Sequence, residues 1–333
     1  MANMDGTIPR IDFAGIDPAA AAGPGRDSAR WAAVRAAVME ALCEHGVFEA
    51  VMDGLIAPEL SAAMLGPGGA AESFFSLPPS TKALYTNMEK PYLGYLSSSF
   101  LTLPYETLCV KDTLFPDGVP ALASLMWPDA GNPSFCETVQ AYTEKLSALA
   151  TVVLRMVLES LGATAECIEE QARATSLALR LSGYEAPGTA EGRLGLFTHR
   201  DKSFLSVLTH NGLDGLEVEL GRGEGGWARP TLSPGGFHVL AGDMLQVLTN
   251  DRVFSPLHRV VVAGDKTRYA FVLFSNPGDD VVVRAVDAAV DAQRPAAYRP
   301  FQYSEYVGFF FSKEHNDKLN KLEAFTALGI DGT

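Results

Sequence analysis

The sequence predicts an α+β fold in which helices flank an antiparallel β-sandwich or jelly roll. Up to about residue 175, apolar residues recur at spacings of three and four, as on one face of a helix. From about Ser176, short apolar runs follow one another roughly every ten residues and are broken by glycine, proline and aspartate. The 333 residues, 47% of them hydrophobic, suffice for a large buried core.

The N-terminal part is predicted to be mostly helical with two short strands. The strands are expected over Ile8 to Phe13 and Val47 to Met52. Between them, Asp27 or Ser28 can cap a helix whose apolar face continues until Gly46 stops it. This region therefore supplies helices that cover a sheet built further along the chain.

A long helix is predicted from Pro133 to Gly162, about twenty-nine residues and about 43 Å at 1.5 Å per residue. Such a length suits a helix that braces the side of a sheet. The strands of that sheet and two closing C-terminal helices are expected, in order, at Leu177–Tyr184, Phe204–Thr209, Leu216–Leu220, His238–Leu240, Leu245–Thr249, Arg259–Val262 and Tyr269–Phe274, then Tyr303–Phe311 and Asn316–Phe325.

Charge and cysteine content exclude several classes of function. Counting 26 Lys and Arg against 40 Asp and Glu gives a net charge of −14, and no basic stripe is present, so nucleic acid is not an expected partner. The four cysteines lie far apart without a CxxC pair, which fits a reducing compartment. No apolar stretch reaches about 18 residues and the first residues do not resemble a targeting signal, so we expect a cytoplasmic protein without a membrane partner.

The main chemical signal is His199-Arg200-Asp201, with His258 further along. In an extended segment, residues two apart point to the same face, so this imidazole and carboxylate can bind one metal together. Two imidazoles and one carboxylate on one face of an octahedron leave the opposite face open, as Fe(II) needs to bind a co-substrate and O2. Alone, an HxD pair is weak, and each histidine could be an ordinary surface or core residue; the strands that follow Asp201 and His258 favour the metal site.

Arg268 is a candidate anion-binding residue whose position depends on one turn. If the loop after Val262 has three residues, Arg268 pairs opposite Val262 and shares a face with His258, whereas a two-residue turn would put it outside. The levels of His258 and Arg268 then differ by about 13 Å. A five-carbon dicarboxylate held by metal at one end and by an arginine fork at the other would fill this gap. Taken alone, Arg268 is better interpreted as a solvated hairpin charge.

Several segments, taken together, resemble the plant-type 2-oxoglutarate- and Fe(II)-dependent dioxygenases over nearly the whole chain. The most specific stretch runs from Gly242-Asp243-Met244-Leu245-Gln246 to Ser255-Pro256-Leu257-His258-Arg259-Val260, which is similar to the family's GDxLQ to SxxHRV segment. Other matching segments are Ile8–Phe13, Glu44–Phe48, Phe74–Pro78 with Lys82 and Tyr85, and, most like the branch of the glucosinolate side-chain enzymes, Trp127-Pro128 and Arg155–Gly162.

The resemblance implies a double-stranded β-helix (jelly roll) core and a role for individual residues. His199, Asp201 and His258 match the iron ligands, Arg268 matches the arginine that holds the distal carboxylate of 2-oxoglutarate, and Tyr184 falls at the tyrosine of the NxY element. Two co-substrate positions depart from the family: its RxS serine is Ala270 here, and the NxY asparagine is Ser182. A lost hydrogen bond to a charged group costs about 1.5–3 kcal/mol, so these changes bear on co-substrate affinity.

The implied activity is oxidation of a small-molecule metabolite with conversion of 2-oxoglutarate to succinate and CO2. Its cofactors would be Fe(II), O2 and 2-oxoglutarate, with ascorbate as a candidate reductant, and a monomer is the default. Alternatives are an oxidase on the same fold with another electron donor, a nucleic-acid demethylase, which the charge opposes, and a non-catalytic jelly-roll binding module. The expected regions are 1–120, a bracing helix region 121–175, the core 176–283 and closing helices 284–333. The expected substrate pocket comprises Tyr92, Tyr95, Phe115, Phe197, Phe271 and Phe309.

Overall fold

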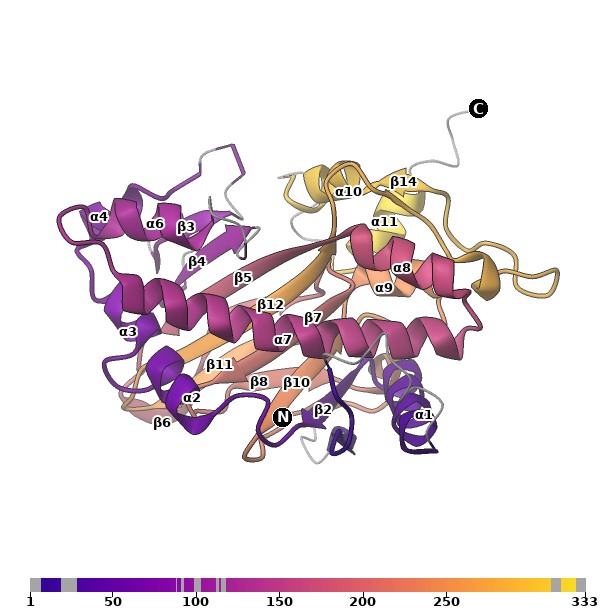
Figure 1. Ribbon diagram of the computed structural model, residues 1–333, viewed down its shortest axis with the longest axis horizontal. Coiled ribbons are helices and arrows are strands. Elements are labelled where there is room, and N and C mark those ends of the chain that lie inside the picture. Colours follow the sequence, from indigo (N-terminus) through magenta and orange to yellow (C-terminus); the bar gives the residue numbers. More distant parts are fainter. Residues whose placement is uncertain are drawn as a thin grey trace.

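A large, mostly antiparallel sheet runs through the molecule in the computed structural model (Figure 1). The structure describes residues 7–18, 29–87, 89–90, 93–98, 103–111, 114, 118–312 and 319–327. The strand order of the large sheet is β1-β2-β10-β7-β12-β5-β4-β3. Its strands are β1 (Arg10–Asp12), β2 (Val47–Val51), β3 (Gly94–Leu96), β4 (Tyr105–Lys111), β5 (Thr175–Tyr184), β7 (Leu205–His210), β10 (Gly236–Ala241) and β12 (Arg268–Pro277).

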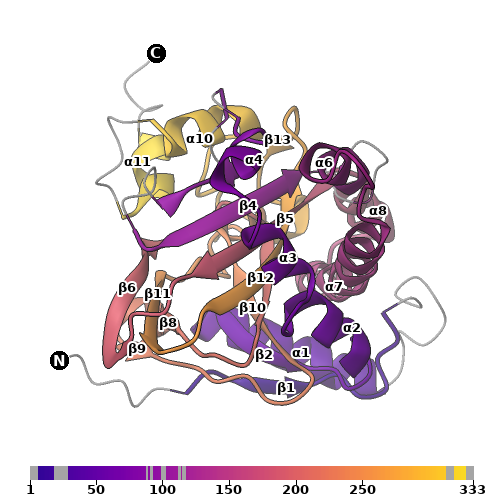
Figure 2. The same cartoon turned by 90° about the vertical axis from the view of Figure 1, so that its left-hand side faces the viewer.

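A smaller sheet faces the large one and closes the sandwich. Its order is β6-β11-β8-β9, from β6 (Thr189–His199), β11 (His258–Gly264), β8 (Leu216–Glu219) and β9 (Trp227–Ala228). Side chains of both sheets meet in two buried clusters, one containing Val218 and Leu240 and the other Tyr184 and Val260. Figure 2 shows this sheet on one side of the large sheet and the long helix on the other.

The long helix α7 (Pro133–Ser160) covers the outer face of the large sheet, as predicted (Figure 1). Pro133 occupies the first turn, and the Asn132 side chain caps the helix by accepting a hydrogen bond from the Phe135 amide at 3.0 Å. Tyr142 of α7 packs on Phe271 of β12 with ring centroids 4.9 Å apart. This main core therefore lies between α7 and the sheet, away from the sandwich interior.

The remaining helices surround this frame. Next to α7 lies α1 (Ala29–Glu44), whose predicted apolar face is buried through Trp31, Val34, Val38 and Leu42. The others are α2 (Pro58–Leu65), α3 (Ala70–Phe75), α4 (Pro79–Ala83), α6 (Val119–Met126), α8 (Ala165–Arg173), α9 (Asp243–Leu248), α10 (Tyr303–Phe310) and α11 (Lys321–Ala327), with β13 (Val282–Val283) and β14 (Phe301–Gln302) forming a separate two-stranded sheet.

Three local predictions differ from the structure. The expected strand Leu245–Thr249 is the helix α9, because a short apolar run does not by itself distinguish a strand from a buried helix. The strand β6 was not predicted, because most of its residues are exposed and it contains two glycines. The predicted helix Asn316–Phe325 begins at Lys321 in the described residues, and residues 313–318 lie outside them.

The predicted hairpin between His258 and Arg268 is wrong. β11 pairs with β6 and β8 in the small sheet, whereas β12 pairs with β5 and β7 in the large one. The chain therefore crosses from one sheet to the other between Gly264 and Arg268, and the register of Arg268 is set by Tyr184 on β5 rather than by Val262.

The predicted regions 1–120 and 176–283 contribute strands to one sheet. Strands β1 to β4, from residues before 120, join β5, β7, β10 and β12 in the large sheet.

All four cysteines are free thiols. Among the described helices, none combines the length and the apolar character needed to cross a bilayer.

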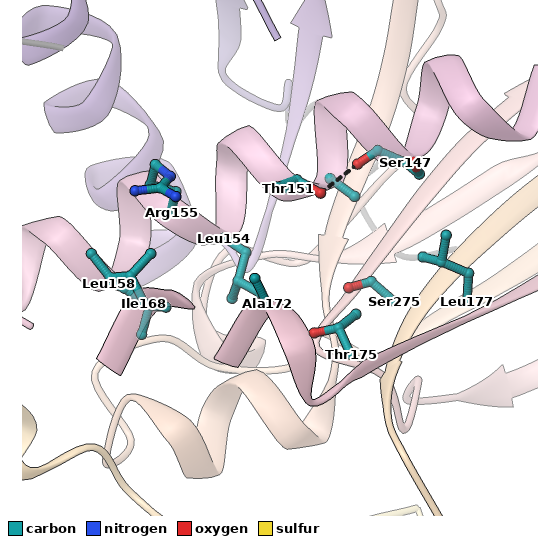
Figure 3. Close-up of a pocket in the computed structure, with 11 residues that line it drawn as sticks. Ser147, Thr151, Leu154, Arg155, Leu158, Ile168, Ala172, Thr175, Leu177 and Ser275 are labelled. Atoms are coloured by element: carbon teal, nitrogen blue, oxygen red, sulfur yellow. Dashed lines mark hydrogen bonds between the residues drawn. The ribbon is translucent and has the colours of Figure 1, made fainter. Parts of the chain in front are cut away.

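A cavity between α7, α8 and the outer face of the large sheet is separate from the sandwich interior (Figure 3). Leu154 and Arg155 of α7, Ile168 of α8 and Leu177 of β5 line it. Arg155 pairs with Glu169 at 2.5 Å. Among the residues that the structure describes, its lining contains neither histidine nor carboxylate.

Candidate metal centre and co-substrate site

His199, Asp201 and His258 come together at the edge of the sandwich interior. His199 ends β6 and His258 begins β11, and the two are direct partners across these antiparallel strands. The Nε2 atoms of His199 and His258 lie 3.6 and 3.7 Å from the two carboxylate oxygens of Asp201, and one potential ligand atom from each residue lies within 4.8 Å of the others. Two imidazoles and a carboxylate in this arrangement can bind one divalent metal on one face.

The outer nitrogen of each imidazole is engaged by backbone. Nδ1 of His199 lies 2.7 Å from the carbonyl of Phe197, and Nδ1 of His258 lies 3.2 Å from the carbonyl of Pro256. A carbonyl only accepts hydrogen bonds, so each Nδ1 carries the proton and each Nε2 presents a lone pair to the centre. Both rings are thus prepared as metal ligands before any metal binds.

Asp201 is positioned by a serine and by the start of α9. Ser206 Oγ donates a hydrogen bond to Oδ2 of Asp201 at 2.5 Å, and the Asp243 amide donates to the Asp201 carbonyl at 2.7 Å. The chain passes so close that a Cβ at Gly242 would lie 2.2 Å from the Ser203 carbonyl oxygen. A glycine is therefore required where the Gly-Asp pair of the sequence motif holds the Asp201 loop.

The electrostatics of the three residues suit cation binding. Burial and the neighbouring His258 lower the pKa of His199 to about 3, so this ring is neutral near pH 7. Burial alone would raise the pKa of Asp201, but His258, His199 and the Ser206 hydrogen bond hold it below its usual value. A neutral ring beside a carboxylate is the protonation state that metal binding requires.

Arg268 projects into the same interior from the first residue of β12. It is 2% exposed, and its Nε donates to the Leu213 carbonyl at 2.8 Å. Both terminal guanidinium nitrogens are buried without a hydrogen-bond partner in the described part of the chain. A buried charge with two unused donors is costly unless an anion completes it. The donor set therefore fits the distal carboxylate of 2-oxoglutarate, which a guanidinium binds through two hydrogen bonds.

The other predicted co-substrate residues lie beside Arg268. Tyr184 is its partner on β5, and the Arg268 guanidinium lies over the Tyr184 ring at 5.3 Å. Ser182 pairs with Ala270, and both line the same cavity as the two histidines and Asp201. We call this the metal cavity; apolar side chains that include Leu208, Leu240 and Val260 form much of its wall.

The predicted substrate-pocket residues are dispersed. Tyr92 and Phe115 lie outside the described residues. Tyr95 packs against Phe74 in the main core, and Phe271 points to α7, because neighbouring residues of a strand face opposite sides and Ala270 faces the interior. Phe197 is 52% exposed, and Phe309 packs against Phe325. The structure does not bring these four aromatic residues together in the wall of the metal cavity.

Sequence reasoning missed three charged or titratable residues near the centre. Arg180 of β5 lines the metal cavity, and burial together with the positive charge of Arg180 lowers the pKa of Lys202 to about 8. His210 of β7 lies opposite Ala270 on the adjacent strand. Alternation along the strands could have placed both Arg180 and His210 on the inward face. On β5, Arg180 shares a face with Ser182 and Tyr184, and on β7, His210 shares a face with Ser206.

A two-sheet sandwich with two histidines and one carboxylate at its edge defines a non-haem metal oxygenase. Residues 176–277 match the model of the 2OG-Fe(II) oxygenase superfamily. A probable 2-oxoglutarate-dependent dioxygenase of Arabidopsis thaliana, AOP1.2, is 34% identical over 306 residues, covering 90% of this chain and 92% of the relative. The 2-oxoglutarate-dependent dioxygenase AOP3 of the same plant is 28% identical, with 90% and 94% covered. The chain belongs to the 2OG-Fe(II) oxygenase superfamily.

Solved structures agree with this membership. The dioxygenase for auxin oxidation of rice superimposes with a TM-score of 0.74 at 28% identity and covers 92% of this chain and 96% of its own. JOX2, solved in complex with 2OG, Fe and JA, gives a TM-score of 0.71 at 26% identity, with 90% and 84% covered. The jelly-roll fold is thus confirmed, and the protein is an oxidoreductase, a 2-oxoglutarate-dependent dioxygenase that uses Fe(II) and oxidises a small-molecule metabolite.

Proposed function

We propose that His199, Asp201 and His258 bind the catalytic Fe(II), and that Arg268 binds the distal carboxylate of 2-oxoglutarate with Tyr184 beside it. The observation that carries this proposal is the pair of buried, unpartnered terminal nitrogens of Arg268 in the same interior as three convergent metal ligands. An oxidase that uses another donor would not need a buried guanidinium with both terminal nitrogens unpaired among the described residues at this place.

Each of these residues has a task that follows from its contacts. When bound, Fe(II) and 2-oxoglutarate supply the oxidising chemistry, in which 2-oxoglutarate becomes succinate and CO2. The two Nδ1–H groups fix the imidazoles, and Ser206 fixes Asp201, so the ligands do not reorganise during turnover. Leu208, Leu240 and Val260 keep the interior apolar, which strengthens the pairing between Arg268 and a carboxylate.

An anaerobic titration tests the proposal. Adding 2-oxoglutarate to the Fe(II) protein should produce a visible metal-to-ligand charge-transfer band, and His258→Ala should remove it together with iron binding. His45→Ala, at a partly buried histidine on the loop between α1 and β2, is the matched control. A full band in His258→Ala would show that the metal is held elsewhere.

We further propose that the enzyme works in the cytoplasm on a free small molecule. The four free thiols support a reducing compartment. Succinate release over a panel of metabolites, with oxygen consumption measured in parallel, would identify the substrate.

A further inference from the structure

A second cavity meets the metal cavity at Arg180. We call it the outer cavity; it shares Arg180 and Phe274 with the metal cavity. Its remaining lining includes Lys90, Lys111 and Lys202. A molecule that reaches from the metal ligands toward the outer cavity would pass Arg180, the cation that lines both cavities.

The charge of the outer cavity is opposite to that of the chain. Acidic residues outnumber basic ones in the sequence by 40 to 26, yet four cations and one carboxylate, Asp279, are found among the described lining residues. Asp279 pairs with Lys111 at 3.0 Å and with Lys90 at 3.5 Å. The carboxylate is therefore engaged at the outer end, whereas Arg180 lies at the inner end.

Arg180 forms no ion pair with a carboxylate among the residues that the structure describes. Its strand neighbours are Cys109 and Val272, and its guanidinium lies over the Phe274 ring at 5.3 Å. Its Nε is buried and makes no hydrogen bond to any described residue. The carboxylate that acts on it electrostatically is Asp201, whose charge a bound metal would use. Arg180 is thus a buried cation at the junction of the two cavities whose Nε is left unpaired in the described part of the chain.

We propose that the organic substrate is an anion, a carboxylate or a sulfate, whose charged group binds Arg180 where the two cavities meet. This inference rests on the proposed function, because it uses the metal centre to place the oxidised carbon. Arg180 would hold the charged end of the substrate, and the apolar wall of the metal cavity would hold the part that is oxidised. Arginine suits this task because it binds a carboxylate or sulfate through two parallel hydrogen bonds.

Binding to the anaerobic Fe(II)–2-oxoglutarate protein tests this substrate class. The probes are 3-phenylpropanoate, octanoate, phenyl sulfate and phenylmethanesulfonate, each measured by calorimetry beside a neutral amide or ester of the same shape. We expect an anion to bind at least tenfold more tightly than its neutral partner, and Arg180→Gln to remove that difference. Lys90→Gln, at the outer cation paired with Asp279, is the control and should change affinity less than threefold.

Other outcomes overturn the inference. If every anion binds no better than its neutral partner, or none binds, the substrate is not an anion of this class. If Arg180→Gln weakens 2-oxoglutarate as strongly as it weakens the anion, Arg180 serves the co-substrate instead. Failure of the proposed function has a different signature, because the charge-transfer band would then be missing before any probe is added.

A second inference concerns the serine that Ala270 replaces. Ala270 of β12 pairs directly with His210 of β7, and directly paired residues project from the same face of a sheet. Ala270 lines the metal cavity, and so do Ser206 and Leu208 of β7. His210 shares their face of β7, because the three residues are spaced two apart along the strand. His210 therefore faces the interior in which Arg268 lies.

His210 is a buried donor without a hydrogen bond. Its side chain is 4% exposed, and neither ring nitrogen has a hydrogen-bond partner in the described structure, although Nε2 approaches Asp214 Oδ1 to 3.4 Å. Burial and the positive charge of Arg268 keep the ring neutral by lowering its pKa to about 3. A neutral imidazole still carries one N–H, which can replace a serine hydroxyl as a hydrogen-bond donor.

We infer that His210 donates to the distal carboxylate of 2-oxoglutarate in place of the missing serine. His210→Ala should then raise the dissociation constant of 2-oxoglutarate, read from the anaerobic charge-transfer band, by about tenfold. Ala270→Ser should have little effect alone and should restore affinity in the His210→Ala background. The binding of 2-oxopentanoate, which lacks the distal carboxylate, should be the same in all variants and reports that the fold is intact.

The inference is overturned by either of two results. One is that His210→Ala leaves the dissociation constant of 2-oxoglutarate unchanged. The other is that it weakens the binding of 2-oxopentanoate equally, which would mean that His210 only supports the fold. Absence of a band with either oxo acid in the unmodified protein would instead contradict the proposed function.

Discussion

Replacing Arg268 by Met should stabilise the protein without ligand and abolish its response to 2-oxoglutarate. The substitution removes a buried cation with two unsatisfied terminal nitrogens, each of which costs about 1–3 kcal/mol. It also removes one hydrogen bond, to the Leu213 carbonyl, worth about 1 kcal/mol. The balance is a gain of about 1–5 kcal/mol, or several degrees in melting temperature. Two lost charge-assisted bonds to 2-oxoglutarate, at about 1.5–3 kcal/mol each, weaken its binding more than a hundredfold.

Two assays on the same preparation decide this prediction. Thermal unfolding without ligand reports the melting temperature, and the anaerobic charge-transfer titration reports the dissociation constant of 2-oxoglutarate. Arg268→Lys, which keeps the charge but loses the planar fork, should show weakened binding without the gain in stability. A fall of several degrees for Arg268→Met would show that the guanidinium supports the fold, and unchanged 2-oxoglutarate binding would refute its assignment to the co-substrate.

Three further predictions address the metal ligands, the Asp201 loop and the buried histidines. Proteins with His199→Ala or His258→Ala should lose bound iron and turnover together and keep a native circular dichroism spectrum, because each change removes a ligand without disturbing the main core. An iron-free variant with full activity would contradict the assignment. Gly242→Ala should lower the free energy of unfolding by about 1–3 kcal/mol and weaken iron binding, because the new Cβ would lie 2.2 Å from the Ser203 carbonyl oxygen. An unchanged melting temperature and iron affinity would show that the loop adapts freely. Burial lowers the pKa of His238 from 6.5 to about 3, so this ring is neutral in the folded protein and takes up a proton on unfolding. The free energy of unfolding should therefore fall as the pH drops below about 6.5, and His238→Leu should reduce that slope by about 1.4 kcal/mol per pH unit. An unchanged slope would mean that His238 already carries its proton in the folded protein.

Much of the fold was predictable because its elements carry strong local signals. The periodicity of α7, its initial Pro133 and the alternation of β12 predict these elements directly. The pairing of strands could not be predicted in the same way, because β11 and β12 are adjacent in sequence yet lie in different sheets. Nothing between Gly264 and Arg268 distinguishes a hairpin from a crossover between sheets.

The same limit applies to the site. The convergence of His199, Asp201 and His258 was predictable because two of them lie within one extended segment and the third begins a strand. Alternation along a strand can assign Arg180 and His210 to the inward face, but only the pairing between strands places His210 opposite Ala270. The predicted aromatic pocket failed for Phe271 because a shift of one residue along a strand moves a side chain to the opposite face.

A crystal structure of the anaerobic protein with Fe(II) and 2-oxoglutarate, with iron located by its anomalous scattering, tests the assignment of the site most directly. We predict one iron peak bound by Nε2 of His199, Nε2 of His258 and a carboxylate oxygen of Asp201, with the distal carboxylate of 2-oxoglutarate on both terminal nitrogens of Arg268. An iron peak away from these three residues, or a distal carboxylate that does not contact Arg268, would contradict the assignment.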